Sequence, residues 1–361
     1  MFLKHKIFSL FFNILTKLPV NNHRVSFIVD SNNSFSSNLN YVREEFEKRN
    51  AFEFNYFYKD KFSFNSFTRL ATSKYIFLND NFFPLAFMKF KNDSLVIQLW
   101  HAPGAFKKFG ASVENAEMLK KISENTDYLI ITSEFVKEFY REAFQIDESK
   151  IKVLGLPRSD YYFKNHDLSS LREKFCKKFN IDCDKKIVLY APTFRQDTEY
   201  NNVFNYLDLK EFNTKLSDEY VLLLRLHPKV KKFYKNDIQS GEYYVDCSSY
   251  ENEQELLLIS DILITDYSSI MIEFALLNRP IIFFAYDLDN YLNNERGFYL
   301  DYKHDLPGPV VYNSRQLIDC ISKGADKSKL ESFVQLQFGE IDGESSRRIV
   351  DFALKKGGNN D

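Results

Sequence analysis

Glycine is scarce in this chain, and the glycine patterns of two common nucleotide sites are missing. Only 11 of the 361 residues are Gly. The sequence contains neither the G-x-G-x-x-G loop of dinucleotide-binding folds nor the Walker A loop of nucleoside-triphosphatases. These absences argue against a dinucleotide-binding enzyme of the usual kind and against a P-loop enzyme.

Cysteine pairs and excess positive charge are also missing. Cys176, Cys183, Cys247 and Cys320 are scattered without a C-x-x-C spacing. This usage is typical of ordinary thiols in a reducing compartment, and it indicates neither a disulfide framework nor a zinc site. The formal net charge is -2, so the chain is not a nucleic-acid binder of the basic type. We expect no nucleic-acid partner, and no metal ligands are predicted.

The first 24 residues contain no Asp or Glu and surround an apolar run at residues 7–15. That run is too short to span a bilayer, and no small-residue cleavage site follows it. Helical spacing places polar side chains on one face and Phe and Leu on the other. The pattern favours an amphipathic helix over residues 1–20 that lies in a membrane interface. A helix docked on the core of the protein is the alternative. The polar face consists of Lys6, Ser9, Asn13, Thr16 and Lys17.

Short apolar runs alternate with helical patterns along the rest of the chain. At this length two domains are expected, and the alternation predicts parallel sheets with crossover helices. We therefore predict an α/β fold of the GT-B type, with two Rossmann-like domains facing across a cleft. The expected divisions are 1–20, 21–158, 159–345 and 346–361. The predicted strands are 24–29, 52–58, 74–78, 95–99, 128–132, 151–154, 187–190, 220–225, 261–264 and 280–284.

Polar side chains follow the predicted strand at 95–99. In open α/β sheets, ligands bind beyond the carboxyl ends of the strands. His101 stands at such an end and is a candidate general base, with a purely structural histidine as the alternative. Gly104 permits close approach of the backbone. Lys107 and Lys108 are placed to meet a phosphate of an acceptor.

A second polar stretch, Thr265-Asp266-Tyr267-Ser268-Ser269, lies between a predicted strand and a helix. Helix starts and serine hydroxyls bind phosphate, although plain helix capping uses the same residues. One turn later, Glu273 is a candidate acceptor for ribose hydroxyls. Arginines at three further strand ends predict a cationic wall for a diphosphate, with surface ion pairs as the alternative. These arginines are Arg158, Arg195 and Arg225, and His227 accompanies the last.

Taken together, these blocks resemble the CDP-glycerol glycerophosphotransferase family of teichoic-acid and capsule synthesis, especially its short, primase-like members. One departure is that Trp100-His101 continues as Ala-Pro-Gly-Ala-Phe-Lys, where the better-known polymerases have Gly-Thr-Pro-Leu-Lys. The sequence therefore does not identify which polyol is transferred. The blocks are Trp100-His101 with Gly104, Lys107, Lys108 and Gly110; Gly155 to Asp160; Tyr190 to Arg195; Arg225 to Pro228; Asp261 to Ser269; Pro280 with Asp287; and Arg296-Gly297 before Pro307-Gly308-Pro309.

The resemblance implies transfer of glycerol phosphate, ribitol phosphate or another polyol phosphate from a CDP-polyol to a hydroxyl of a lipid-linked saccharide, with release of CMP. It implies an acceptor domain at 21–158 and a CDP-donor domain at 159–345. Catalysis is assigned to His101 and His227. Donor binding is assigned to Pro192, Thr193, Arg195, Arg225, Thr265, Ser268, Ser269 and Glu273, and acceptor binding to Gly104, Lys107, Lys108 and Arg158.

No tightly bound cofactor is expected, and magnesium is not implied by the sequence. The expected location is the cytoplasmic face of the bacterial membrane, as a peripheral protein. Two other functions fit the same fold. One is a glycosyltransferase that uses a nucleotide sugar. The other is a non-enzymatic membrane partner of an export complex, which the presence of both His101 and His227 disfavours.

Overall fold

A computed structural model of the chain describes residues 2–30, 38–49, 51–114, 116–195, 198–227, 230, 244–295 and 297–358. The chain divides into two compact units. Unit 1 comprises Met1–Phe163 and Leu336–Asp361, and unit 2 comprises Lys164–Gln335. Unit 2 is therefore one continuous segment inserted between the two segments of unit 1.

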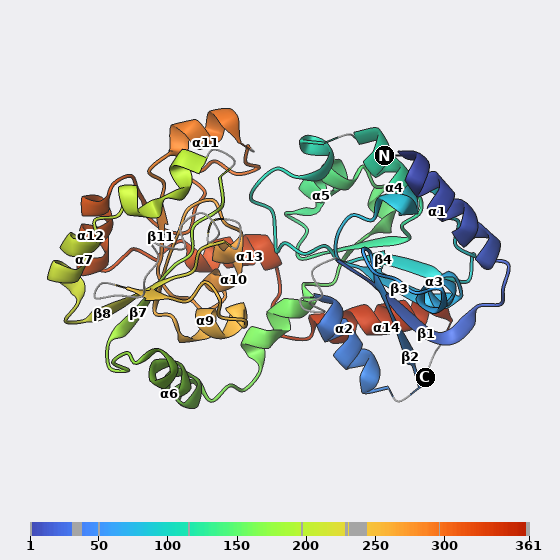
Figure 1. Cartoon of the computed structure of the whole chain (residues 1–361), viewed down its shortest axis with the longest axis horizontal. Helices are drawn as coiled ribbons and strands as arrows, with labels where there is room; N and C mark the ends of the chain where they lie inside the picture. Colours follow the sequence, from blue (N-terminus) through green and yellow to red (C-terminus); the bar gives the residue numbers. More distant parts are fainter. Residues whose placement is uncertain are drawn as a thin grey trace. The chain divides into compact units, whose positions relative to one another are not determined.

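Six parallel strands form the sheet of unit 1 in the order β2-β1-β3-β4-β5-β6 (Figure 1). All six residues of the central strand β3 are buried, as expected for a parallel sheet that is covered on both faces. The strands are β1 (Asn21–Val29), β2 (Glu53–Tyr58), β3 (Ser73–Leu78), β4 (Leu95–Gln98), β5 (Tyr128–Ile131) and β6 (Ile151–Val153).

Two layers of helices cover this sheet, because alternate strand residues point to opposite faces. Phe27 and Phe77 pack in one cluster with residues of α2 (Asn38–Glu47) and α14 (Ser345–Gly357). Their neighbours Ile28 and Ile76 pack in another cluster, with residues of the helices on the other face. Those helices are α1 (Phe2–Leu15), α3 (Phe64–Ala71), the 3-10 helix η1 (Phe83–Phe87) and α4 (Ala116–Glu124). The remaining elements of unit 1 are η2 (Gly110–Ser112), α5 (Lys137–Phe144), η3 (Glu148–Lys150) and η4 (Pro157–Phe163).

Unit 2 repeats this architecture with its own six-stranded parallel sheet, in the order β12-β11-β10-β7-β8-β9. The strands are β7 (Lys186–Tyr190), β8 (Tyr220–Leu224), β9 (Val245–Asp246), β10 (Ile262–Thr265), β11 (Ile281–Phe284) and β12 (Val310–Val311). The helices are α6 (Leu168–Phe179), η5 (Thr198–Asn201), η6 (Val203–Asn205), α7 (Leu209–Leu216), α9 (Glu253–Ile259), α10 (Ile270–Ala275), α11 (Leu288–Asn294) and α12 (Ser314–Lys323). Helix α13 (Leu330–Phe338) begins in unit 2 and ends in unit 1.

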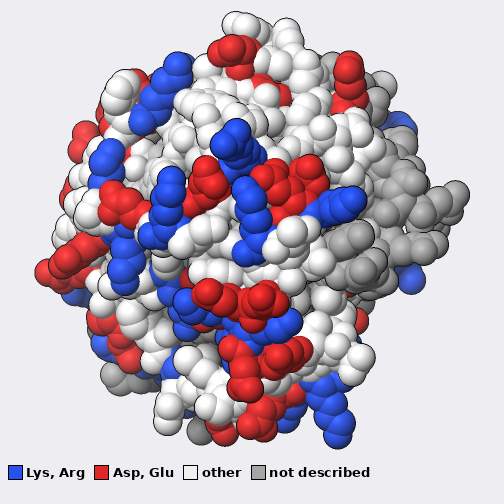
Figure 2. All heavy atoms as spheres, turned by 90° about the vertical axis from the view of Figure 1, so that its left-hand side faces the viewer, with Lys and Arg blue, Asp and Glu red and all other residues white. Residues whose placement is uncertain are grey.

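The face of the molecule nearest α7 and α12 mixes both signs of charge. Figure 2 shows Lys and Arg side chains interspersed with Asp and Glu over this face, and the described residues there gather no large patch of one sign. Such a surface gives no electrostatic reason to expect a polyanion on this side.

Helix α1 docks on unit 1 in an unexpected orientation. Two of its polar residues face the protein: Ser9 donates to the carbonyl of Pro84 (2.9 Å), and Asn13 donates to the carbonyl of Phe87 (3.1 Å). Phe12 is completely buried in the core beneath. The apolar outer face is left exposed, and it consists of Leu3, Ile7, Leu10, Phe11, Ile14 and Leu18. Ser9 and Asn13 are turned inward because they satisfy carbonyls of η1, whereas Lys6 and Lys17 are exposed.

The predicted α/β fold with two Rossmann-like halves is confirmed, and so is the N-terminal helix. The division of the chain differs from the expected one in two respects. The first unit runs to Phe163 and not to Arg158, because η4 packs in unit 1. The first and last helices are not separate parts, because α1 and α14 both contribute to the core of unit 1. In the described residues, no helix has both the length and the apolar character needed to cross a membrane.

Candidate functional site

In unit 1 the candidate site begins where β4 ends, at Trp100 and His101. Trp100 has a φ of 59°, a left-handed conformation that is uncommon for a bulky residue. Two buried side chains hold its peptide groups in this conformation. The N–H of Trp100 donates to Oε1 of Gln98 (2.9 Å), and its carbonyl accepts from Nδ2 of Asn38 (2.7 Å). The turn aims His101 away from the sheet, and 49% of its side chain is exposed.

The loop after His101 is held by side chains from two other helices. The hydroxyl of Tyr140 in α5 lies 3.0 Å from the carbonyl of Ala102 and 2.8 Å from that of Gly104. Gln337, at the end of α13, pairs with both peptide groups of Ala105. Gly104 has a φ of 55°, which a glycine adopts without strain. The loop is therefore rigidly placed although it belongs to no helix or strand.

The surroundings of His101 favour its neutral form. Desolvation lowers the pKa of His101, and the positive charge of Arg158 lowers it further. The carboxylates of Asp80 and Asp30 and a hydrogen bond to the carbonyl of Asn79 raise it in part. Since the net pKa lies below the ordinary value, the imidazole is neutral at pH 7 and able to accept a proton. The carboxylates in turn stabilise the imidazolium that proton transfer would form.

The other predicted acceptor residues differ in accessibility. Arg158 lies close enough to His101 for its charge to act on the imidazole, and its backbone N–H donates to Oδ1 of Asn38 (2.9 Å). Lys108 is exposed and Lys107 is half-buried. Gly104 is buried and shapes the loop. The structure therefore brings Arg158 to His101 and leaves Lys108 open to solvent.

In unit 2 the predicted donor residues follow three adjacent strands, because β7 pairs with both β8 and β10. The carboxyl ends of parallel strands meet at one edge of a sheet. Arg225 and His227 follow β8, Pro192 and Thr193 follow β7, and Ser268 and Ser269 follow β10. One contact ties two of these segments together, since the N–H of Thr193 donates to Oδ1 of Asp266 (2.8 Å).

The polar groups at this edge include atoms with capacity for a ligand. Ser269 precedes α10, and its side chain makes no capping hydrogen bond. Oγ1 of Thr193 is buried and has no hydrogen-bond partner among the described residues. Arg225 donates to the carbonyl of Tyr250 (2.7 Å) and is partly exposed, and His227 is exposed. The arrangement matches what a phosphate needs, namely hydroxyls and a cation at one edge of a sheet.

Arg195 does not form the predicted cationic wall. Its side chain is 1% exposed, and two carboxylates hold it. Asp287 accepts from Nε and Nη2 (2.9 Å each), and Asp266 accepts from Nη1. Burial alone would lower the pKa of Arg195, but these carboxylates raise it well above the ordinary value. The guanidinium is buried and already paired with two carboxylates, which does not support the predicted contact with donor phosphate, and that contact stays a prediction.

Two more predicted donor residues are interior groups. The hydroxyl of Thr265 is fully buried and donates to the carbonyl of Ala191 (2.8 Å). Glu273 lies in the first turn of α10 and is 2% exposed. Neither residue is accessible to a ribose or a phosphate. Their burial does not support the predicted contacts with the donor, which stay predictions.

The block from Gly155 to Asp160 stabilises unit 1. The carboxylate of Asp160 accepts the backbone N–H groups of Ser345 (2.9 Å) and Ser346 (2.8 Å) at the start of α14. Gly155 has a φ of 94°, and a Cβ there would lie 2.3 Å from Oγ of Ser345. This block therefore fixes the last helix on unit 1. Of the other residues in the resemblance, Pro228 and Arg296 lie outside the described residues.

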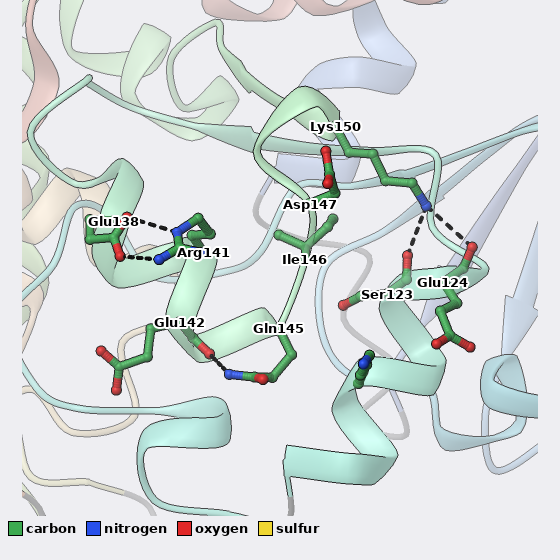
Figure 3. Close-up of a pocket in the computed structure, with 10 residues that line it drawn as sticks. Ser123, Glu124, Glu138, Arg141, Glu142, Gln145, Ile146, Asp147 and Lys150 are labelled. Atoms are coloured by element: carbon green, nitrogen blue, oxygen red, sulfur yellow. Dashed lines mark hydrogen bonds and ion pairs between the residues drawn. The ribbon is translucent and has the colours of Figure 1, made fainter.

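A hollow of about 730 Å³ in unit 1 lies away from His101. Figure 3 shows its lining, where Lys150 donates to the carbonyls of Ser123 and Glu124. These residues adjoin the amino ends of β5 and β6, whereas His101 follows the carboxyl end of β4. The hollow is thus at the wrong edge of the sheet for the site. Within the described part of the chain, no three His, Cys, Asp or Glu side chains group as metal ligands would.

Several supporting residues were not predicted from the sequence. Asp80 follows β3, the neighbour of β4, so the polar residues after the predicted strand at 74–78 could have indicated it. Asn38, Tyr140 and Gln337 carry no comparable signal, because each reaches the His101 loop from a helix distant in sequence.

Comparison with known proteins gives consistent results. The family model described as CDP-Glycerol:Poly(glycerophosphate) glycerophosphotransferase matches residues 10–355. A teichoic acid poly(ribitol-phosphate) polymerase of Bacillus spizizenii is 35% identical over 97% of this chain, which spans 59% of that protein. The teichoic acid glycerol-phosphate transferase of Staphylococcus aureus is 37% identical over 72% of this chain and 71% of its own length.

A solved structure of the wall teichoic acid polymerase TagF is also similar. It is 27% identical, with a TM-score of 0.81 over 98% of this chain and 93% of that one. A UDP complex of S. aureus MnaA gives a TM-score of 0.59 at 12% identity, which shows likeness of fold alone. The match to TagF covers both units and extends to nearly the whole chain.

Proposed function

This chain belongs to the CDP-glycerol:poly(glycerophosphate) glycerophosphotransferase family, and we propose that it transfers a polyol phosphate from a CDP-polyol to a hydroxyl of a lipid-linked acceptor. The polyol is glycerol or a related alcohol such as ribitol, and the product belongs to teichoic-acid or capsule synthesis. Relatives named for both polyols support this range. The structure of a TagF variant soaked with CDPG, which aligns with this chain at 25% identity, is also similar.

The observation that carries the proposal is the placement of His101, which is half-exposed after β4 on a loop that Tyr140 and Gln337 hold. A neutral imidazole on a rigid loop, with two carboxylates nearby, is suited to accept one proton and to tolerate the charge that results. In the proposed step the acceptor hydroxyl gives its proton to His101, and its oxygen forms a bond to the polyol-bearing phosphorus. The bond from that phosphorus to CMP breaks, and CMP leaves with the electron pair.

The donor half of the proposal rests on the edge of the unit 2 sheet. Arg225 and His227 supply positive or hydrogen-bonding groups, and Ser268 and Ser269 supply hydroxyls, after adjacent strands. Such groups stabilise the charge that develops on the leaving CMP. Phosphoryl transfers depend mainly on positioning and electrostatics. These residues and His101 therefore supply the types of side chain that the reaction needs.

The acceptor is lipid-linked, and the outer face of α1 supports attachment to the cytoplasmic face of a membrane. Leu3, Leu10 and Phe11 are 70%, 62% and 59% exposed on one face of the helix. Such a row of large apolar side chains is costly in water and is suited to the acyl boundary of a bilayer. Lys4, Lys6 and Lys17 add positive charge on the same helix or just after it, which attracts anionic lipid.

The proposed function is tested by release of CMP. The purified protein is incubated with CDP-glycerol, CDP-ribitol or a panel of nucleotide sugars, together with a lipid-linked acceptor. We expect CMP and an extended acceptor from a CDP-polyol, and a His101→Ala variant should turn over about 10² to 10⁴ times more slowly. Sugar transfer in place of polyol-phosphate transfer, or full activity of His101→Ala, would refute the proposal.

A further inference from the structure

We infer that Gln337 is a positioning residue for His101, an inference that rests on the proposed function. Its Oε1 accepts the N–H of Ala105 (2.8 Å), and its Nε2 donates to the carbonyl of Ala105 (3.2 Å). Both residues are 1% exposed. The side chain of Gln337 thus binds both the N–H and the carbonyl of one loop residue, which lies four positions after His101.

This pairing is specific to a primary amide. Ala105 lies outside the sheet and the helices, so its N–H and carbonyl need partners from side chains. An amide offers one acceptor and one donor at the spacing that a backbone partner would provide. Replacement of Gln337 by an apolar residue would leave two buried peptide groups of Ala105 without partners. The loop would have to move to satisfy them.

Gln337 is itself anchored to the sheet. The hydroxyl of Thr132 donates to the carbonyl of Gln337, and the hydroxyl of Ser133 donates to that of Leu336, both at 2.6 Å. Thr132 and Ser133 follow β5, the strand beside β4. The end of α13 is therefore fixed to the same edge of the sheet that carries His101. Because Gln337 is held at this edge, its two hydrogen bonds to Ala105 also hold the loop in place.

The consequence for catalysis follows from the demands of proton transfer. A displacement of about 1 Å at a reacting group can cost about 100-fold in rate. Loss of the Gln337 contact should therefore lower kcat. The predicted donor groups belong to unit 2, whereas Gln337 and the loop belong to unit 1, so KM for the CDP-polyol should stay close to the wild-type value.

The experiment compares Gln337→Met and Gln337→Glu with the wild-type protein in the full chain. The methionine removes both hydrogen bonds, and the isosteric glutamate, when ionised, removes only the donor. We expect kcat to fall at least tenfold for Gln337→Met, with KM for the CDP-polyol changed less than threefold. Ser332→Ala is the matched control, because it removes one side-chain hydrogen bond at the start of α13 that is part of neither the anchor of Gln337 nor its contact with Ala105.

A second readout does not depend on activity. Trp100 is the single tryptophan of the chain, and its ring centroid lies 4.2 Å from that of His101. An imidazolium in contact quenches indole emission, so Trp100 fluorescence against pH reports the titration of His101. In Gln337→Met we expect the transition to move up towards the pKa of a solvated imidazole, because desolvation is the largest cause that lowers it now.

The inference is overturned if Gln337→Met keeps kcat within twofold, if Ser332→Ala loses as much, or if the Trp100 transition does not move. Circular dichroism checks that each variant is folded. If Gln337→Met unfolds, kcat and the Trp100 transition of Gln337→Glu are judged by the same criteria. Unfolding of both would also overturn the inference, since Gln337 would then serve the stability of unit 1. If the wild-type protein releases no CMP, the proposed function fails, and the fluorescence comparison still decides the link from Gln337 to His101.

Discussion

Oδ1 of Asp80 lies 4.0 Å from Nδ1 of His101. Asp80 follows β3, and His101 follows the adjacent strand β4, so the sheet itself sets their separation. A carboxylate at this distance favours the charged imidazole over the neutral one. It therefore opposes the desolvation that lowers the pKa of His101.

We predict that Asp80→Asn lowers the pKa of His101 further. Activity requires the neutral imidazole, so it is lost as the pH falls through that pKa, and the acidic limb of the kcat/KM profile should move to lower pH. The plateau should also fall, because the imidazolium loses its counter-charge. Asp30→Asn should act in the same direction but less, since Asp30 contributes less than Asp80. An unchanged pH profile in Asp80→Asn would contradict this assignment.

Ser269→Ala should weaken donor binding without loss of stability. The Ser269 side chain makes no capping bond to α10, so its removal leaves the fold intact. If the hydroxyl binds donor phosphate, the loss is about 0.5–1.5 kcal/mol, or roughly 2- to 12-fold in Kd. Calorimetry with CDP-glycerol measures it. The control is Ser322→Ala, because the hydroxyl of Ser322 makes its hydrogen bond within α12. An equal Kd in both variants would show that Ser269 does not bind the donor.

Arg195→Met should destabilise the protein strongly. The substitution leaves the buried carboxylates of Asp266 and Asp287 without their cation, which typically costs about 3–5 kcal/mol. Urea unfolding measures the change. Arg347→Met is the control, because its ion pairs are exposed and are worth only about 0–1 kcal/mol. Lost CDP-glycerol affinity at unchanged stability would restore the original prediction of a phosphate ligand.

Polar substitutions on the outer face of α1 should release the protein from membranes. Leu10→Gln with Phe11→Gln changes two exposed side chains and leaves the buried Phe12 in place. We expect weaker flotation with vesicles that contain anionic lipid, while activity on a soluble acceptor is retained. The control is Leu168→Gln with Leu292→Gln, which alters two exposed leucines of unit 2. Equal flotation of the two double variants would rule out α1 as the contact surface.

The strands and their order along the chain were largely predictable, because buried parallel strands appear as continuous apolar runs. The structure confirms the runs at 74–78 and 187–190 as β3 and β7. The edge strands β9 and β12 were not predicted, because each has two residues and is too short to form a recognisable apolar run. The position of His101 just after a strand was predictable from the sequence and is confirmed, whereas its role as a base stays a prediction.

What could not be predicted depends on partners far away in the chain. Arg195 resembled a phosphate ligand until Asp266 and Asp287, 71 and 92 positions later, proved to neutralise it. For helix α1, the sequence does not say which residues meet the protein. The carbonyls of Pro84 and Phe87 accept from Ser9 and Asn13 and turn these side chains inward beside the buried Phe12, whereas Lys6 and Lys17 are exposed.

The insertion of unit 2 into unit 1 reverses the usual order in which a nascent chain completes its domains. Unit 2 is contiguous and is fully synthesised once Gln335 is added. Unit 1 still lacks α14, whose Ile349, Val350 and Ala353 belong to its core. The half that begins first is therefore finished last, and a chain that stopped between Gln335 and α14 would have an incomplete unit 1, which carries His101, and a complete unit 2.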